Sequence, residues 1–255
     1  MIANAKKFQG MVLNRNGRYN DLHEFNIGGF TISSKTYVEL LGIEIDFKLN
    51  FNKYLAKICK KAGGQLNTIC RYNKFIDLEE KRTLIESFVQ SNFNFCPLVW
   101  MFTSLKSVRK IEAVQKRALR ILLNDYTSDY NTLLNMSKKS NVVTRIHRIL
   151  AREVFKTLND CNPEYMKTIF VKNLRENSRR PNDLQRQGFR GITYGQNSLR
   201  EVGAQIWNKL PENFKSAPSL INFKNLIKTW SDFRCSCKMC KAVGNKNDPI
   251  DDEDD

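Results

Sequence analysis

The spacing of apolar residues changes at about residue 50, and this change constrains the fold most strongly. Before it, three short segments rich in β-branched and aromatic residues, FQGMVL, FNIGGFTI and YVELLGIEID, predict strands near turn-forming Asn and Gly residues. The last segment alternates only loosely, which is typical of a strand covered on both faces. After residue 50, apolar residues recur about every 3.6 positions, which predicts amphipathic helices. We therefore expect an α+β chain, predominantly α-helical, with a short N-terminal antiparallel β segment, a helical bundle and an irregular C-terminal region.

Local signals indicate where these helices begin and end. Asp77 and Glu80 have the spacing of a capping box, and Ser104 is placed to cap a long helix that ends at about Asn124. Pro97 interrupts any helix in the aromatic segment between them. Further helices are expected from residue 51 to 69, from 142 to 158, from 198 to 209 and from 220 to 230.

The charge of the chain favours polyanionic partners. Lys and Arg number 42 against 26 Asp and Glu, a formal net charge of +16. Six of the acids lie in the tail after residue 245, so the remaining body holds 41 basic and 20 acidic residues. Nucleic acid is the expected partner, because many Lys and Arg side chains gain binding free energy by releasing counterions from phosphates. An ordinary solvated surface is the alternative.

The basic residues lie on the predicted helices, away from the apolar stripes, and in a loop between about residues 172 and 195. On rigid elements they can contact phosphates along a backbone, and the guanidinium fork of Arg suits phosphate especially well. Such contacts position RNA, DNA or an RNA–DNA hybrid without reading its bases. The candidate nucleic-acid-binding residues are Lys60, Lys61, Arg71, Lys74, Arg109, Lys110, Lys116, Arg117, Arg120, Arg179 and Arg180.

Residue patterns typical of a catalytic centre do not occur in the sequence. The two histidines, His23 and His147, lie in different regions without an obvious Ser or Cys partner. There is no phosphate-binding glycine loop, and the acidic residues after Pro249 lack a rigid frame that could fix two metal ions. We expect no catalytic residue, no required cofactor and no enzymatic activity in this chain alone.

The cysteines form two groups. Four of them, Cys59, Cys70, Cys96 and Cys161, occur singly among apolar residues, which suggests reduced, buried thiols in an intracellular protein. The other three form a CxCxxC motif near the C-terminus, a pattern that can bind a structural zinc ion. A fourth ligand could be Cys161, His147 or a residue of another chain, and a set of reduced thiols is the alternative. The candidate metal ligands are Cys235, Cys237 and Cys240.

Several segments, in order, resemble the C-terminal part of reverse transcriptases from non-LTR (LINE-type, Jockey-like) retrotransposons. Among them are VELLGIEIDFKLNFN, SNFNFCPLVW, QKRALRILLNDY, YGQNSLREVGAQIWNKLP and CSCKMC, and the resemblance covers nearly the whole chain. It implies a primer-grip-like element at Leu40, Leu41 and Gly42, where the polymerase palm meets the thumb. The helices after Asn50 would form the thumb, which straddles a template–primer duplex, and the terminal cysteines would match a Cys-rich segment thought to grip nucleic acid.

The resemblance also implies a division of the chain and a function. Residues 1–49 would be the palm end, 50–170 a thumb-like domain, 171–244 a C-terminal region with the basic loop and the cysteines, and 245–255 a disordered acidic tail. The catalytic aspartates, and the Mg²⁺ that they bind in the complete parent enzyme, would belong to polymerase domains upstream of this chain.

We therefore expect a truncated reverse-transcriptase fragment that binds template–primer RNA or DNA and has no polymerase active site of its own. A host-adopted nucleic-acid-binding or regulatory protein with a C-terminal metal knuckle and an expressed remnant without function are the alternatives. No apolar run approaches the roughly 18 residues of a membrane span, so we expect no membrane partner and a location in the nucleus or cytoplasm.

Overall fold

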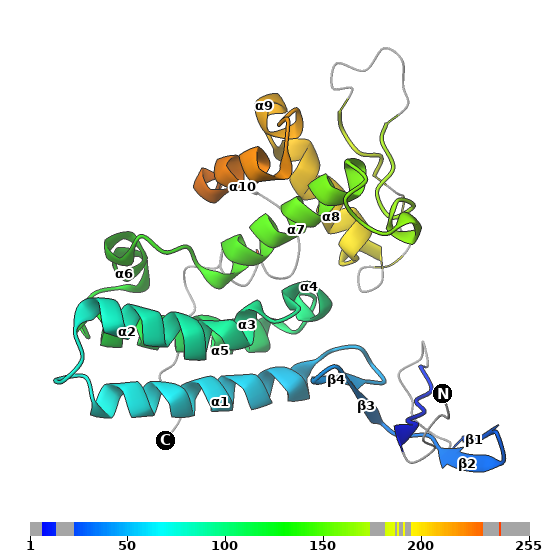
Figure 1. The fold of residues 1–255 in the computed structure, drawn as a ribbon, viewed down its shortest axis with the longest axis horizontal. Helices are drawn as coiled ribbons and strands as arrows, with labels where there is room; N and C mark the ends of the chain where they lie inside the picture. The colour runs from blue at the N-terminus through cyan, green and yellow to red at the C-terminus, as the bar shows by residue number, and fades with distance from the viewer. Residues whose placement is uncertain are drawn as a thin grey trace.

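The computed structural model describes residues 7–13, 23–173, 182–186, 188, 191, 195–231 and 240. These residues form a predominantly helical α+β structure that begins with two short antiparallel hairpins, which confirms the expected fold class (Figure 1). None of the helices in this part of the chain combines the length and apolar character that a membrane crossing needs.

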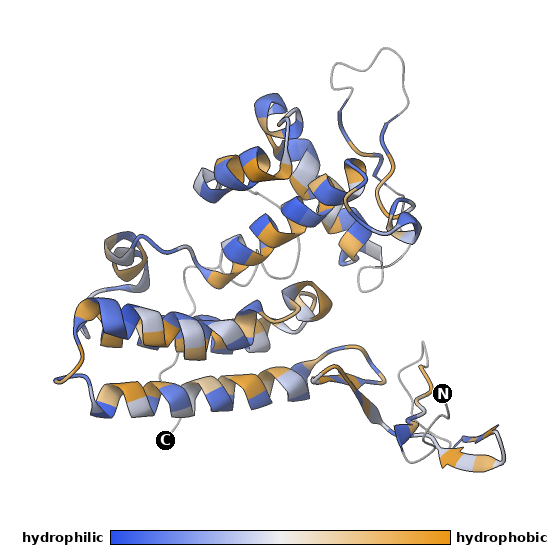
Figure 2. Cartoon of the chain, viewed as in Figure 1, coloured by the Kyte–Doolittle hydropathy of each residue, from blue (hydrophilic) through white to orange (hydrophobic). Residues whose placement is uncertain are grey.

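The first hairpin pairs β1 (Glu24–Ile27) with β2 (Phe30–Ser33). Its turn consists of Gly28 and Gly29, whose φ angles of 58° and 82° are readily adopted by glycine. Both strands expose apolar side chains, and Figure 2 shows this hairpin as largely apolar at one end of the molecule. The first predicted strand, FQGMVL, contributes one isolated parallel bridge, at Gly10.

The second hairpin pairs β3 (Tyr37–Leu40) with β4 (Ile43–Asp46). Leu41 and Gly42 form its turn with φ angles of 51° and 83°, the positive values that a type I′ turn requires. The prediction of one strand covered on both faces from residue 37 to 46 is therefore wrong. The turn reverses the chain at Leu41, whose side chain is 85% exposed.

α1 (Asn52–Arg71) follows directly and buries the apolar stripe that the sequence predicts. The carboxylate of Asp46 fixes the entry to this helix, because it accepts the backbone N–H groups of Asn50 at 3.2 Å and Phe51 at 2.7 Å. The buried residues of α1 are Tyr54, Leu55, Ile58, Ala62, Leu66 and Ile69.

The next segment is divided into α2 (Leu78–Leu84), the π-helix η2 (Ile85–Gln90), α3 (Ser91–Asn94) and α4 (Pro97–Trp100). The predicted capping box is present: Asp77 accepts the N–H of Glu80 at 2.8 Å, and Glu80 accepts the N–H of Asp77 at 3.1 Å. Pro97 occupies the first turn of α4, where its missing N–H costs no helical hydrogen bond.

Three helices complete the middle of the chain: α5 (Leu105–Leu123), α6 (Tyr130–Ser137) and α7 (Val142–Leu158). Ser104 caps α5 by accepting the N–H of Ser107 at 3.3 Å, and Asn124 ends it in the left-handed conformation. These bounds confirm the predicted long helix, and α7 has the predicted range. α6 was not predicted.

The C-terminal region contains η3 (Glu164–Met166), α8 (Leu199–Lys209), α9 (Glu212–Lys215) and α10 (Leu220–Thr229). α8 and α10 confirm two predicted helices, and both pack against α7. Phe155 of α7 stacks on Phe223 of α10 with ring centroids 4.4 Å apart, and Trp207 of α8 lies beside both. A single cluster of buried apolar residues extends from Ile43 to Ile227, and the expected domain boundaries remain a prediction.

The prediction of buried thiols holds only in part. Cys59, Cys70, Cys96 and Cys161 form no disulfide, and Cys59 is half-buried. The other three are exposed, so the expectation of burial is wrong for them. Cys70 lies on α1, where adjacent residues point about 100° apart, so it is exposed although Ile69 beside it is buried. Cys96 and Cys161 lie outside the helices, at a bend before α4 and in the loop after α7.

Candidate nucleic-acid interface

α1 and α5 run parallel and pack against each other. At their N-terminal ends the Asn52 side chain accepts hydrogen bonds from Ser104 at 2.9 Å and Ser107 at 2.8 Å. Further along, the Arg117 guanidinium donates to the side-chain oxygen of Asn67. We call this line of contact the α1–α5 seam. It is formed by Asn52, Ala56, Cys59 and Asn67 on α1 and by Ser104, Ser107, Lys110 and Arg117 on α5.

The cations of α5 divide into two rows. With about 100° per residue, Lys106, Lys110 and Arg117 project from the side of α5 that faces the seam. Their contacts agree, because Lys106 and Lys110 line a pocket at the seam and Arg117 bonds to α1. The second row lies about 80° round the helix from the first, on the side farther from α1, and its residues are half-buried. It consists of Arg109, Lys116 and Arg120.

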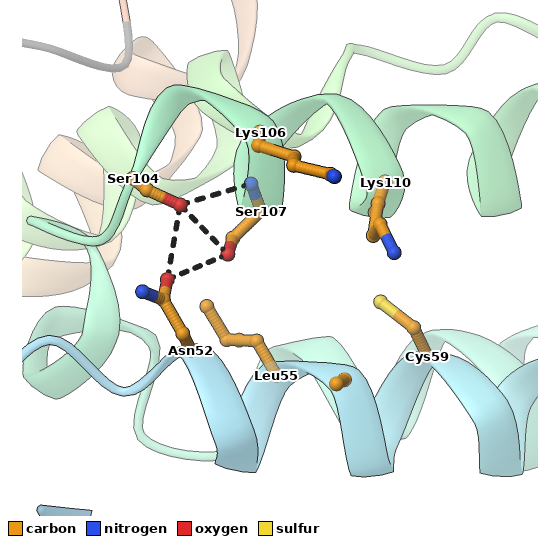
Figure 3. Close-up of a pocket in the computed structure, with 8 residues that line it drawn as sticks. Asn52, Leu55, Cys59, Ser104, Lys106, Ser107 and Lys110 are labelled. Atoms are coloured by element: carbon orange, nitrogen blue, oxygen red, sulfur yellow. Dashed lines mark hydrogen bonds between the residues drawn. The ribbon is translucent and has the colours of Figure 1, made fainter. Parts of the chain in front are cut away.

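A pocket of about 250 Å³ opens at the N-terminal end of the seam, between α1 and α5 (Figure 3). Lys106 and Lys110 extend over it from α5, and the thiol of Cys59 points into it from α1. Burial raises the pKa of that thiol to about 11, and the positive charge of Lys110 opposes this rise. Cys59 is therefore protonated near neutral pH, and the net charge of the pocket lining is positive.

The cations of α1 have different roles. Lys53 and Lys57 attach the β3–β4 hairpin, because the Lys53 ammonium lies 4.0 Å from the Tyr37 ring centroid and Lys57 pairs with Glu44 at 2.6 Å. Both are therefore occupied by contacts within the chain.

Two candidate cations of α1, Lys60 and Arg71, are exposed on the side of the helix next to the seam. Lys61 is exposed farther round α1, and Lys74 is exposed in the loop that follows the helix. In the part of the chain that the structure describes, neither Lys60 nor Arg71 lies within salt-bridge distance of a carboxylate, and the same holds for Lys106, Lys110 and Arg117.

The structure thus brings together Lys60, Arg71, Lys110 and Arg117 of the predicted residues and turns the second row of α5 away from them. Lys106, on the polar side of the same predicted helix, joins the first group. Arg179 and Arg180 lie outside the described residues. The predicted primer-grip residues Leu40, Leu41 and Gly42 form the exposed tip of the β3–β4 hairpin.

Of the three predicted metal ligands, Cys235 and Cys237 lie outside the described residues. The Cys240 sulfur lies 3.8 Å from Nε2 and 3.9 Å from Nδ1 of His147, which is buried on α7. Three or more potential metal ligands do not cluster anywhere within the described ranges.

Neither a protein-family model, nor a curated protein, nor a solved structure matches this chain. The resemblance to reverse transcriptases therefore remains an expectation from the sequence.

Sequence reasoning missed three exposed aromatic residues at the other end of the seam, Tyr72, Phe75 and Tyr126. Two of them belong to the segment Arg71-Tyr72-Asn73-Lys74-Phe75, where cations alternate with aromatic residues. That alternation is a signal for nucleic-acid binding that the sequence carries.

Proposed function

We propose that this chain binds nucleic acid through phosphate contacts along the α1–α5 seam. The observation that carries the proposal is the row formed by Lys106, Lys110 and Arg117, which faces α1 and has no carboxylate partner among the described residues. Eleven residues separate the ends of this row, about 17 Å at 1.5 Å per residue. Measured along a DNA duplex axis, one strand presents a phosphate about every 3.4 Å, so the row has the axial length of about five phosphates.

The sequence resemblance supports a more specific form of the proposal. In it, the chain is a reverse-transcriptase-like fragment that holds a template–primer duplex of RNA and DNA through backbone contacts and has no polymerase site of its own. Recognition would depend on the shape of the duplex and on its phosphates more than on sequence.

The test compares two variants with the same loss of charge. The seam variant replaces Lys106, Lys110 and Arg117 with Gln. The control variant replaces three exposed lysines elsewhere, Lys172, Lys224 and Lys228, with Gln. Fluorescence anisotropy measures binding of a labelled RNA–DNA hybrid at salt concentrations between about 50 and 200 mM.

We expect the seam variant to bind roughly tenfold more weakly at low salt, with a log–log salt slope smaller by about three. The control variant should keep most of its affinity, because its charges lie away from the seam. Equal losses in both variants would mean that net charge, and not the seam, attracts the nucleic acid. Absence of salt-dependent binding in the unchanged protein would refute the proposal and favour a remnant without function.

A second candidate, a host-adopted binding or regulatory protein with a metal knuckle, rests on a separate observation. The His147 ring is 1% exposed and lies beside the Cys240 sulfur. Three thiolates of the CxCxxC motif with one imidazole would make the four-ligand set that structural zinc requires.

Metal analysis of the purified protein tests this second candidate. We expect about one zinc ion per chain, lost in both Cys237→Ser and His147→Gln. The matched control is Cys161→Ser, which alters an exposed cysteine. An unchanged zinc content in Cys237→Ser would show that the CxCxxC motif does not bind the zinc ion, and the metal knuckle would be excluded.

A further inference from the structure

Three aromatic side chains are exposed at the C-terminal end of the seam. Tyr72 is 56% exposed and Phe75 is 84% exposed in the loop after α1, and Tyr126 is 55% exposed in the loop after α5. We call these three residues the aromatic tip. Their rings gain little from burial in this chain, so their positions are not explained by core packing.

The two loops that carry these residues are joined. Asn73 donates a hydrogen bond from its side-chain nitrogen to the side-chain oxygen of Asn124 at 2.6 Å. The pKa of Tyr126 is raised, first by partial burial and then by the neighbouring Cys70, whereas Arg117 acts in the opposite direction. Tyr126 therefore lies next to the last turn of α1 and next to the last cation of the seam row.

Cations accompany the aromatic tip. Arg71 and Lys74 flank Tyr72 in the sequence and are exposed, and Arg117 lies near Tyr126. The nearby carboxylates bind their own loops: Asp77 caps α2 through the N–H of Glu80.

Asp125 likewise accepts the N–H groups of Thr127 and Ser128, both at 3.0 Å. The Ser128 hydroxyl, followed by these two N–H groups, lowers the pKa of Asp125, so the carboxylate stays ionised and interacts with its own loop.

From this arrangement we infer that the aromatic tip stacks unpaired bases of a single nucleic-acid strand whose phosphates lie along the seam. The inference rests on the proposed function. It adds that the aromatic tip recognises the bases of the ligand, whereas the seam contacts its phosphates. Aromatic rings beside a cationic track are what proteins use to bind single strands, because every base has a face that can stack. A continuous duplex hides those faces, so the tip distinguishes single strands from duplexes.

Binding of two probes tests the inference: a labelled single-stranded oligonucleotide and an RNA–DNA hybrid of the same length. The variant is Phe75→Ala combined with Tyr126→Ala. The matched control is Tyr165→Ala, which removes an aromatic ring that is 75% exposed on η3. Circular dichroism and thermal unfolding establish that each variant is folded.

We expect the double variant to bind the single strand at least tenfold more weakly, with a salt slope close to that of the unchanged protein because no charge is lost. Binding of the hybrid should change by less than about twofold, and the control should bind both probes normally. Ultraviolet cross-linking followed by peptide mass spectrometry should locate the linked base at Tyr72, Phe75 or Tyr126.

Two outcomes would overturn the inference: an equal loss for both probes, or single-strand binding no weaker than in the Tyr165→Ala control. If these occur while the unchanged protein still shows salt-dependent binding through the seam, the proposed function stands and only the stacking role fails. If the unchanged protein binds neither probe, both fail together.

Discussion

The carboxylate of Glu112 on α5 accepts the backbone N–H of Val142, the first residue of α7, at 3.0 Å. It also accepts the N–H of Val143 at 3.3 Å and the hydroxyl hydrogen of Tyr130. Glu112 is only 4% exposed, and desolvation raises its pKa, although these hydrogen bonds oppose the rise. One buried side chain thus connects α5, α6 and α7.

Removal of this carboxylate should destabilise the fold strongly. Glu112→Ala leaves two N–H groups and a hydroxyl buried without their acceptor, so we expect the free energy of unfolding to fall by about 3 kcal/mol or more. Glu112→Gln keeps a carbonyl acceptor and should recover most of that loss. Urea denaturation followed by circular dichroism measures both. A loss in Glu112→Ala no greater than that in Glu86→Ala, which breaks a surface pair with Lys139, would contradict this role.

The Cys59 thiol should react slowly with iodoacetamide at neutral pH. Its pKa is raised from 9.0 to about 11, and only the thiolate attacks the reagent. The alkylation rate should therefore keep rising about tenfold per pH unit from pH 8 to beyond pH 10. A thiol with an ordinary pKa of about 9 is half ionised at pH 9, so its rate levels off near pH 10. Peptide mass spectrometry separates Cys59 from the exposed Cys161, and an early plateau at Cys59 would exclude the raised pKa.

The β3–β4 turn should be stabilised by a change at Leu41. A residue with a branched side chain at φ 51° is strained, and Asn tolerates this region much better. Leu41→Asn creates the Asn-Gly pair favoured in type I′ turns and should slow amide hydrogen exchange in the hairpin. Gly42→Ala, at φ 83°, should have the opposite effect. Faster exchange in Leu41→Asn would show that the turn does not limit hairpin stability.

The same turn explains why the sequence predicted the helices better than the strands. Apolar spacing and the capping residues Asp77 and Ser104 define helices locally, and the structure confirms those starts. The β3–β4 hairpin was missed because its turn begins with Leu41, a residue that is rare at positive φ. α6 was missed because it is only eight residues long, about two turns, which is too short for a helical period to stand out in the sequence.

The candidate site could be predicted in its residue types but not in its arrangement. Helical spacing separates Lys110 from Arg109 by about 100°, so the two rows of α5 could be derived from the sequence. Which row faces α1 depends on the parallel packing of two helices separated by a long connection, residues 72–104. Phe75 and Tyr126 lie in different loops. The hydrogen bond between the side chains of Asn73 and Asn124 joins these loops, and the spacing of residues in the sequence does not reveal it.

Because α1 and α5 pack in parallel, the electrostatic potential of the helix dipoles differs between the two ends of the seam. The peptide dipoles of the two helices add, so both positive ends lie beside Asn52 and Lys106, and both negative ends lie beside Tyr72 and Asn124. The helix dipoles would attract a polyanionic strand at the first end and oppose it at the second, where the cations Arg71, Lys74 and Arg117 and the exposed rings would supply the contacts. The two aligned dipoles therefore favour phosphate binding at the N-terminal end of the seam and base stacking on uncharged rings at the C-terminal end.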